Sequence, residues 1–240
     1  MENEKYRVLN RDVIKYIAMF TMFLNHVANV FLVPGTLGYE VLVDIGYFTA
    51  ITMCYFLVEG YQYTRSKRNY GIRLLIFAIL SEYPFLFAFR NHGVAMNMMF
   101  TLFICFLILV VREKVENSTL QTILVVLLVC VTIISDWAIL AALFTILFDE
   151  WKGDRQKIWD AYKIAIGAFG VMNLLGNLDL YSVPKAILCA LGSCMGILCS
   201  GLVIQYLYNG KRAVHGRTIS KWFFYIFYPA HLLLLGYLAL

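Results

Sequence analysis

Lys15 and His26 set one stretch of this chain apart. They lie in a largely apolar run, residues 11 to 33, that is long enough to cross a bilayer. Because the two positions are eleven apart, a helix would place both on nearly the same face, about 16 Å apart along its axis. Polar residues at such a depth usually serve a pathway, a pair or a site. The spacing therefore predicts a cation near one membrane surface and an imidazole, which titrates near neutral pH, farther along the same face.

Four residues are candidates for chemistry, and each also has a structural interpretation. His26 is a possible general base or acyl-relay residue, or else an interhelical hydrogen-bonding group. Glu59 belongs to a polar stripe at helical spacing. Glu82 falls near the middle of an apolar run, where a lone carboxylate must be paired or protonated. His231 follows Pro229, which should kink a helix and free a carbonyl group.

The composition indicates a membrane protein rather than a soluble one. Of the 240 residues, 61% are hydrophobic and 15% are charged, and the mean hydropathy is +0.73. A soluble domain of this length carries more charge, and the longest polar stretch, about 149 to 163, is too short to bury a core. We expect the first helix to be retained as an anchor. The net charge of +5 suits basic cytoplasmic loops and gives no argument for nucleic acid as a partner.

Cysteine and metal chemistry are not expected. All six cysteines lie in apolar runs, as small buried hydrophobic residues do. Three of them, Cys189, Cys194 and Cys199, are five residues apart, a spacing that moves around a helix and makes a poor metal site. The chain also contains neither an HExxH zinc motif nor a GxSxG nucleophile motif.

The apolar runs predict an all-α integral membrane protein, a polytopic bundle of about nine transmembrane helices in one domain, residues 1–240. The fifth and sixth runs are short, so they could form a re-entrant pair or one crossing. With nine spans and a cytoplasmic N-terminus, 18 of the 20 Lys and Arg residues are cytoplasmic, which favours two separate spans. The predicted spans are 11–33, 43–63, 72–89, 96–111, 119–134, 137–148, 161–178, 183–208 and 218–239. A turn is expected at 90–93.

A group of basic residues lies near the predicted inner ends of the first three spans. It comprises Lys15, Arg65, Lys67 and Arg68, with Arg73 nearby. Positive-inside topology and contact with the head groups of membrane lipids explain most of these charges. A phosphate-rich cofactor bound there could also extend a long arm toward His26. Coenzyme A, with a charged nucleotide, a flexible pantetheine and a terminal thioester, has that form.

Five blocks of the sequence resemble the TraX family, which takes its name from the F-pilin acetylation protein. The blocks are KYIAMFTMFLNHV at 15–27, FLVEGYQYTRS at 56–66, YGIRLLIFAILSEYPF at 70–85, MNMMFTL at 96–102 and FYIFYPAHLLLL at 224–235. The family is similar to transmembrane acyltransferases that include the acyltransferase-3 proteins and heparan-glucosaminide N-acetyltransferase. The resemblance implies a membrane enzyme that takes acetyl-CoA from the cytoplasm and acylates an acceptor, often on the far side.

At two positions this chain differs from the residues that are usual in the TraX family and its superfamily. The spacing from Lys15 to His26 looks like the basic-residue-x10-His pattern of the wider superfamily, with Lys in place of the more usual Arg. TraX-like sequences commonly carry Asp before the histidine, where this chain has Asn25. Because an amide cannot stabilise an imidazolium by charge, another carboxylate would have to do so, or the activity is altered.

These observations predict an acyl-CoA-dependent transferase in the bacterial inner membrane, with acetyl-CoA as co-substrate and no metal. His26, Glu59, Glu82 and His231 are the candidate catalytic residues, and Lys15, Arg65 and Arg73 are the candidate ligands of the CoA phosphates. The acceptor stays open among a protein N-terminus, an amine, a glycan and a lipid head group. A transporter or channel for a small polar solute, with the same ionisable residues along its pathway, is the alternative, and a non-catalytic membrane scaffold is a third possibility.

Overall fold

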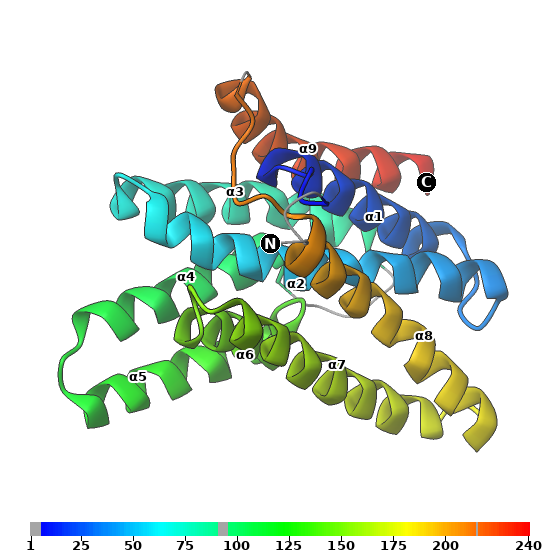
Figure 1. Cartoon of the computed structure of the whole chain (residues 1–240). Helices are drawn as coiled ribbons and strands as arrows, with labels where there is room; N and C mark the ends of the chain where they lie inside the picture. Colours follow the sequence, from blue (N-terminus) through cyan, green and yellow to red (C-terminus); the bar gives the residue numbers. More distant parts are fainter. Residues whose placement is uncertain (1–5, 91–95, 215) are drawn as a thin grey trace. The chain divides into compact units, whose positions relative to one another are not determined.

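A computed structural model describes residues 6–90, 96–214 and 216–240 (Figure 1). Each of the nine predicted apolar segments forms a helix, so the all-α prediction is confirmed for the described residues. The expected turn at 90–93 lies mostly outside them. The helices are α1 (Arg11–Phe31), α2 (Leu37–Tyr63), α3 (Lys67–Ala88), α4 (Met98–Lys114), α5 (Ser118–Val131) with the 3-10 turn η2 (Thr132–Ile134), α6 (Ala138–Glu150), α7 (Arg155–Leu178), α8 (Val183–Leu202) with the π-helical turn η3 (Val203–Leu207), and α9 (Arg217–Leu238).

Three helices begin several residues before the predicted spans. The spans predicted to start near 43, 72 and 161 lie within α2, α3 and α7, which begin at Leu37, Lys67 and Arg155. Hydrogen-bonding caps set two of these starts. The Ser66 side chain accepts from the backbone N–H of Asn69, and the Asp154 side chain accepts from two backbone N–H groups. Each of these two helices thus begins directly after a polar capping residue, several residues before its apolar run starts.

Among the described residues, four helical segments are long and apolar enough to cross a membrane. They are α1, α2, α3 and the continuous segment Val183–Leu207 formed by α8 and η3. The segment Ser118–Ile134, made of α5 and η2, is apolar but shorter.

The chain divides into two compact units that interleave in sequence. Unit 1 contains Met1–Thr52 and Gly153–Ile226, and unit 2 contains Met53–Lys152 and Phe227–Leu240. Helices α2 and α9 therefore contribute residues to both units. Each unit is described by itself below.

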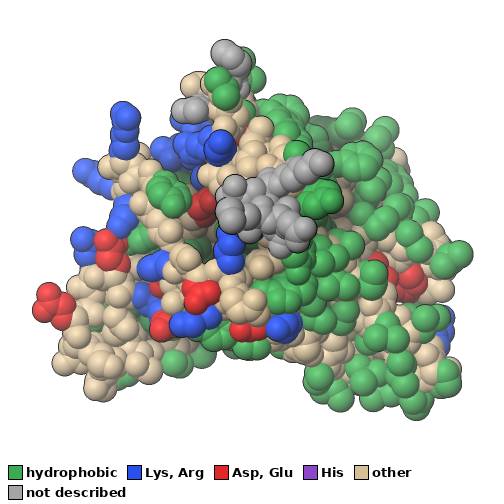
Figure 2. Space-filling model, viewed as in Figure 1, with side chains coloured by type: hydrophobic (Ala, Val, Ile, Leu, Met, Phe, Trp, Pro, Cys, Tyr) green, Lys and Arg blue, Asp and Glu red, His purple; other side chains and the backbone are tan. Residues whose placement is uncertain are grey.

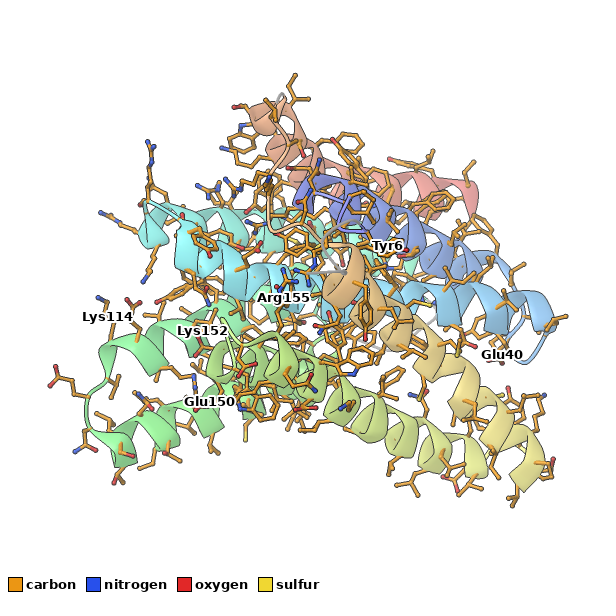
Figure 3. The ribbon with its side chains drawn as sticks, in the orientation of Figure 1. Tyr6, Glu40, Lys114, Glu150, Lys152 and Arg155 are labelled. Atoms are coloured by element: carbon orange, nitrogen blue, oxygen red, sulfur yellow. The ribbon has the colours of Figure 1, made fainter. Side chains whose placement is uncertain are left out.

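In unit 1, backbone pairing joins the start of α1 to the segment that follows η3. Leu9 N–H donates to the Leu207 carbonyl at 3.0 Å, and Arg11 N–H donates to the Lys211 carbonyl at 2.8 Å. The Asp12 carboxylate accepts from the Ser220 hydroxyl at 2.8 Å, which adds the start of α9. Figure 3 labels two residues of unit 1. Arg155 lies at the start of α7, and Glu40, near the start of α2, lies toward the other end of the unit.

Close packing without bulky side chains joins α2 to α8 in unit 1. A Cβ atom built on Gly196 would lie 2.4 Å from the Asp44 carbonyl oxygen and 2.9 Å from the Phe48 backbone nitrogen. The helix backbones are therefore in direct contact, as small residues allow in membrane bundles. Farther along the same contact, the hydroxyls of Thr52 and Ser200 lie 2.7 Å apart.

In unit 2, ion pairs hold one end of the helices together. Lys67 at the start of α3 contacts Glu113 at the end of α4 at 2.6 Å, and Arg112 contacts Asp149 near the end of α6 at 2.8 Å. Figure 2 shows Lys and Arg side chains gathered where α2 passes into α3. At the opposite end, Arg90 donates to the Ala239 carbonyl at 2.6 Å.

Helix α4 begins beside the middle of α3, not at its end. The Asn97 side chain, which caps α4, donates to the Ala78 carbonyl at 2.8 Å. Ala78 precedes the last residue of α3 by ten residues, about 15 Å along the helix. Met96 N–H donates to the Ile134 carbonyl at 2.8 Å, so the turn after α5 lies at the same level. The predicted fifth and sixth segments thus form a hairpin that turns beside the start of α4.

Candidate functional site

Unit 1 contains Lys15 and His26, both on α1. His26 is only 6% exposed, as expected for an imidazole deep in an apolar helix. Lys15 lies half-buried near the start of the helix, and its ammonium is 5.1 Å from the centre of the Phe224 ring on α9. That distance is a cation–π contact. The predicted stripe therefore begins at the end of unit 1 where α1 and α9 start, and His26 lies farther along it.

Asn25 is used to pack α1 against α2. Its amide donates to the Val43 carbonyl at 3.1 Å, and its Cβ lies only 2.2 Å from where a Cβ on Gly46 would be. Asn29 in turn donates to the Asn25 side-chain oxygen at 3.0 Å. An ionised aspartate at position 25 has no N–H in its side chain and could not make the bond to Val43. The departure from the family pattern thus has a local structural role.

Asp44 is a carboxylate that the sequence analysis did not select. It accepts from the Ser193 hydroxyl on α8 at 3.0 Å, and its side chain occupies the space that a Cβ on Gly192 would fill. Because Asn25 binds Val43, Asp44 lies near the level of His26 along unit 1, with its carboxylate turned toward α8. The available signal was a single acidic residue inside an apolar run.

The predicted phosphate ligands of unit 2 differ in their surroundings. Arg65 is exposed between α2 and α3. The guanidinium carbon of Arg73 is 5.7 Å from the centre of the Tyr70 ring, and its buried Nε atom has no hydrogen-bond partner among the described residues. A phosphate oxygen is a suitable acceptor for such a group.

Lys67, in the same basic group, is held by a carboxylate. Its ammonium contacts both oxygens of Glu113, at 2.6 and 2.7 Å, and lies 4.4 Å from the centre of the Tyr61 ring. The Tyr61 hydroxyl also donates to Glu113. The hydrogen bond from Lys67, followed by that from Tyr61, lowers the pKa of Glu113 below its ordinary value. Lys67 therefore contributes less free positive charge at this end than the sequence suggests.

Of the four candidate catalytic residues, three lie in unit 2. Glu59 is half-buried, one turn before the end of α2. Glu82 is half-buried on α3, where its Oε2 atom accepts from the Asn97 amide at 2.6 Å and from the Asn97 backbone N–H at 3.2 Å. Glu82 is thus paired with a neighbouring helix, as its structural interpretation predicted. Asn97 was not selected, although an Asn before an apolar run is a recognisable helix cap.

His231 is 4% exposed on α9, two residues after Pro229. Its Nδ1 atom lies 2.7 Å from the Phe227 carbonyl oxygen. Because a carbonyl only accepts, Nδ1 carries the proton, and Nε2 is the basic nitrogen of the neutral ring. Tyr228, another residue that the sequence analysis passed over, lies 5.7 Å from His231 between ring centres. Helix α9 continues through Pro229 to Leu238.

The residues of the predicted site are divided between the two units. Lys15 and His26 share a face of α1 in unit 1, whereas Arg65 and Arg73 gather in unit 2 near the start of α3. Glu82 and His231 approach the start of α4 through Asn97 and Tyr228, since the Met98 N–H donates to the Tyr228 hydroxyl at 3.3 Å. In the described part of the chain, no three His, Cys, Asp or Glu side chains are grouped as metal ligands would be.

Comparison with known proteins identifies the family. The family described as "TraX protein" matches residues 10–239, which include both units. The chain is also similar to a protein of Dichelobacter nodosus named "Probable fimbrial assembly protein FimC, serogroup H1". The two are 32% identical over 236 residues, and the alignment covers 92% of each chain. No solved structure matches the chain. On the match along nearly its whole length, the chain belongs to the TraX family.

Proposed function

We propose that this protein is an acyltransferase of the bacterial inner membrane. It takes an acetyl or other short acyl group from acyl-CoA at its basic, cytoplasmic side and transfers it to an acceptor within or across the membrane. Membership of the TraX family supports the proposal, as do the four helices that are long and apolar enough to cross a bilayer. The observation that carries it is the buried imidazole of His26 on the same helix as Lys15.

The separation of these two groups suits a long co-substrate. Eleven residues of helix place Lys15 about 16 Å from His26 along the axis. A CoA phosphate bound to the Lys15 ammonium leaves the pantetheine arm free to lie along α1. The thioester then reaches the level of His26.

The transfer needs one base. His26 takes the proton from an acceptor hydroxyl or amine, and the acceptor oxygen or nitrogen forms a bond to the thioester carbonyl carbon. The bond between this carbon and the CoA sulfur breaks, and the departing thiolate receives the proton. No redox step or metal is required. The name of the Dichelobacter relative favours a pilus subunit as the acceptor.

CoA affinity is the first test of this function. Replacing Lys15 by Ala should raise the Kd for CoA by about tenfold, the value of one lost charge-assisted hydrogen bond, and added salt should weaken binding further. Calorimetry on the purified protein in detergent measures both effects. Lys163→Ala is the control, because Lys163 is an exposed lysine of unit 1 that pairs with Asp160. Equal affinity in wild type and Lys15→Ala would assign Lys15 to lipid contact, and no binding by wild type would favour the transporter.

The second prediction is a topology of nine transmembrane spans with the N-terminus in the cytoplasm. Arg212 lies in the segment before α9, and Asp179 lies between α7 and α8, both exposed. In a variant without the native cysteines, an impermeant maleimide added outside should label Asp179→Cys and spare Arg212→Cys. If α5 and α6 together make one crossing, the two labelling results will be exchanged.

A further inference from the structure

The carboxylate of Glu113, near the end of α4, is bound by donors from two neighbouring helices. The Lys67 ammonium on α3 contacts its two oxygens at 2.6 and 2.7 Å, and the Tyr61 hydroxyl on α2 donates to Oε2. An ammonium and a hydroxyl are also donors that bind phosphate oxygens. Glu113 therefore occupies a set of donors that another anion could use.

A second cation, Arg73, lies farther along α3. Lys67, Tyr70 and Arg73 follow one another at intervals of three residues, so they are neighbours on the helix surface. The guanidinium carbon of Arg73 is 5.7 Å from the centre of the Tyr70 ring, which directs its charge back toward the start of the helix and Lys67. The Lys67 ammonium lies 4.4 Å from the centre of the Tyr61 ring. The rings of Tyr61 and Tyr70 both contact the Phe106 ring, at 5.4 and 5.5 Å between centres, so one aromatic cluster carries both cations.

Glu113 balances only part of the positive charge at this place. Lys67 has a carboxylate partner, but the buried Nε atom of Arg73 has no hydrogen-bond partner among the described residues. A buried donor is costly unless an acceptor, such as a ligand oxygen, binds it. The first turn of α3 contains no acidic residue, although the start of a helix favours a negative charge. A ligand with more than one negative charge suits this arrangement.

The ion pair of Lys67 and Glu113 is open to displacement. Their side chains are 36% and 38% exposed, and an exposed ion pair contributes little to stability because water and salt screen it. We propose that the two cations, together with the Tyr61 hydroxyl, form a phosphate-binding site of unit 2, which Glu113 occupies in part until a phosphate group displaces its carboxylate. The ligand is a diphosphate or a phosphate ester, either free or as the head group of an anionic phospholipid. All of these residues belong to unit 2, and the inference does not depend on acyl transfer.

Removing the carboxylate tests this competition. Calorimetry with inorganic diphosphate, on the purified protein in neutral detergent at low salt, gives the Kd. Glu113→Gln should lower the Kd by about fivefold, the scale of an exposed ion pair that no longer has to be broken, while the ligand-free protein melts at a lower temperature. Glu116→Gln is the matched control, because Glu116 is an exposed carboxylate three residues later and its loss removes the same charge without freeing Lys67. Arg73→Gln should raise the Kd by about tenfold, with or without Glu113→Gln.

A second measurement distinguishes a free ligand from a lipid. If the site takes a head group, mixed micelles containing phosphatidylglycerol in place of phosphatidylcholine should raise the melting temperature more in Glu113→Gln than in Glu116→Gln. Adding Lys67→Ala to Glu113→Gln should abolish the gain in either case. A gain with diphosphate assigns a free ligand, and a gain with phosphatidylglycerol alone assigns a lipid. If Glu113→Gln gains nothing over Glu116→Gln with either probe, the ion pair only joins α3 to α4 and the proposal is wrong.

Discussion

His26→Ala should lose acyl transfer by about a hundredfold or more while it still folds and binds CoA. That is the scale of a lost general base. The reason is position, since His26 is 6% exposed on α1 and lies along the helix from Lys15. Initial rates of labelled-acetyl transfer, with CoA affinity measured on the same preparations, give both quantities.

Two further variants make this result specific. His26→Gln keeps a hydrogen-bonding group without a base of suitable pKa, so it should be as inactive as His26→Ala and more stable. Met22→Leu changes a neighbouring residue of the same helix face and should transfer acetyl normally. Near-normal transfer by His26→Gln would make His26 structural. His231, whose Nδ1 proton is directed to the Phe227 carbonyl, would then be the next candidate for the base.

Gly196→Ala should strongly destabilise unit 1. The new Cβ would meet the Asp44 carbonyl oxygen at 2.4 Å and the Phe48 nitrogen at 2.9 Å. Because both atoms belong to the backbone of α2, the helices must separate. We expect a cost of about 2 kcal/mol or more, and a fall of about 5 °C or more in the melting temperature in detergent.

Gly167→Ala is the matched control for this effect. Gly167 lies within α7, and a Cβ built on it meets nothing within 4 Å. Replacing a helical glycine by alanine in open space should stabilise the protein by about 0.5–1 kcal/mol. Equal melting temperatures for the two variants would contradict the direct contact between α2 and α8.

The helices could be predicted from the sequence, because long apolar runs leave the backbone no other way to satisfy its hydrogen bonds in a membrane. Their starts were less predictable. The apolar run that predicted α3 begins at residue 72, but the helix begins at Lys67, after its cap Ser66. Hydropathy measures where a helix meets lipid, whereas the cap determines where it begins.

The candidate site was only partly predictable, because its partners are distant in sequence. The sequence does not show that Lys67 pairs with Glu113, which lies 46 residues later in the chain and offsets the charge of the lysine. Glu82 could be recognised as a costly carboxylate in an apolar run, but not as the partner of Asn97. The position of Asn97 before an apolar run predicts a helix cap, but it does not predict a hydrogen bond to a carboxylate on another helix. Such pairs depend on which helices pack together, which spacing along one helix does not determine.

Transfer of isotopically labelled acetyl from acetyl-CoA tests the central claim most directly. Inside-out membrane vesicles that contain the wild-type chain expose its cytoplasmic side to added acetyl-CoA. The account predicts that label appears covalently on a vesicle component that bears an amine or hydroxyl, that an equal amount of free CoA is released, and that His26→Gln vesicles show neither. Wild-type vesicles that release no CoA and acquire no label beyond vesicles lacking the chain would contradict it.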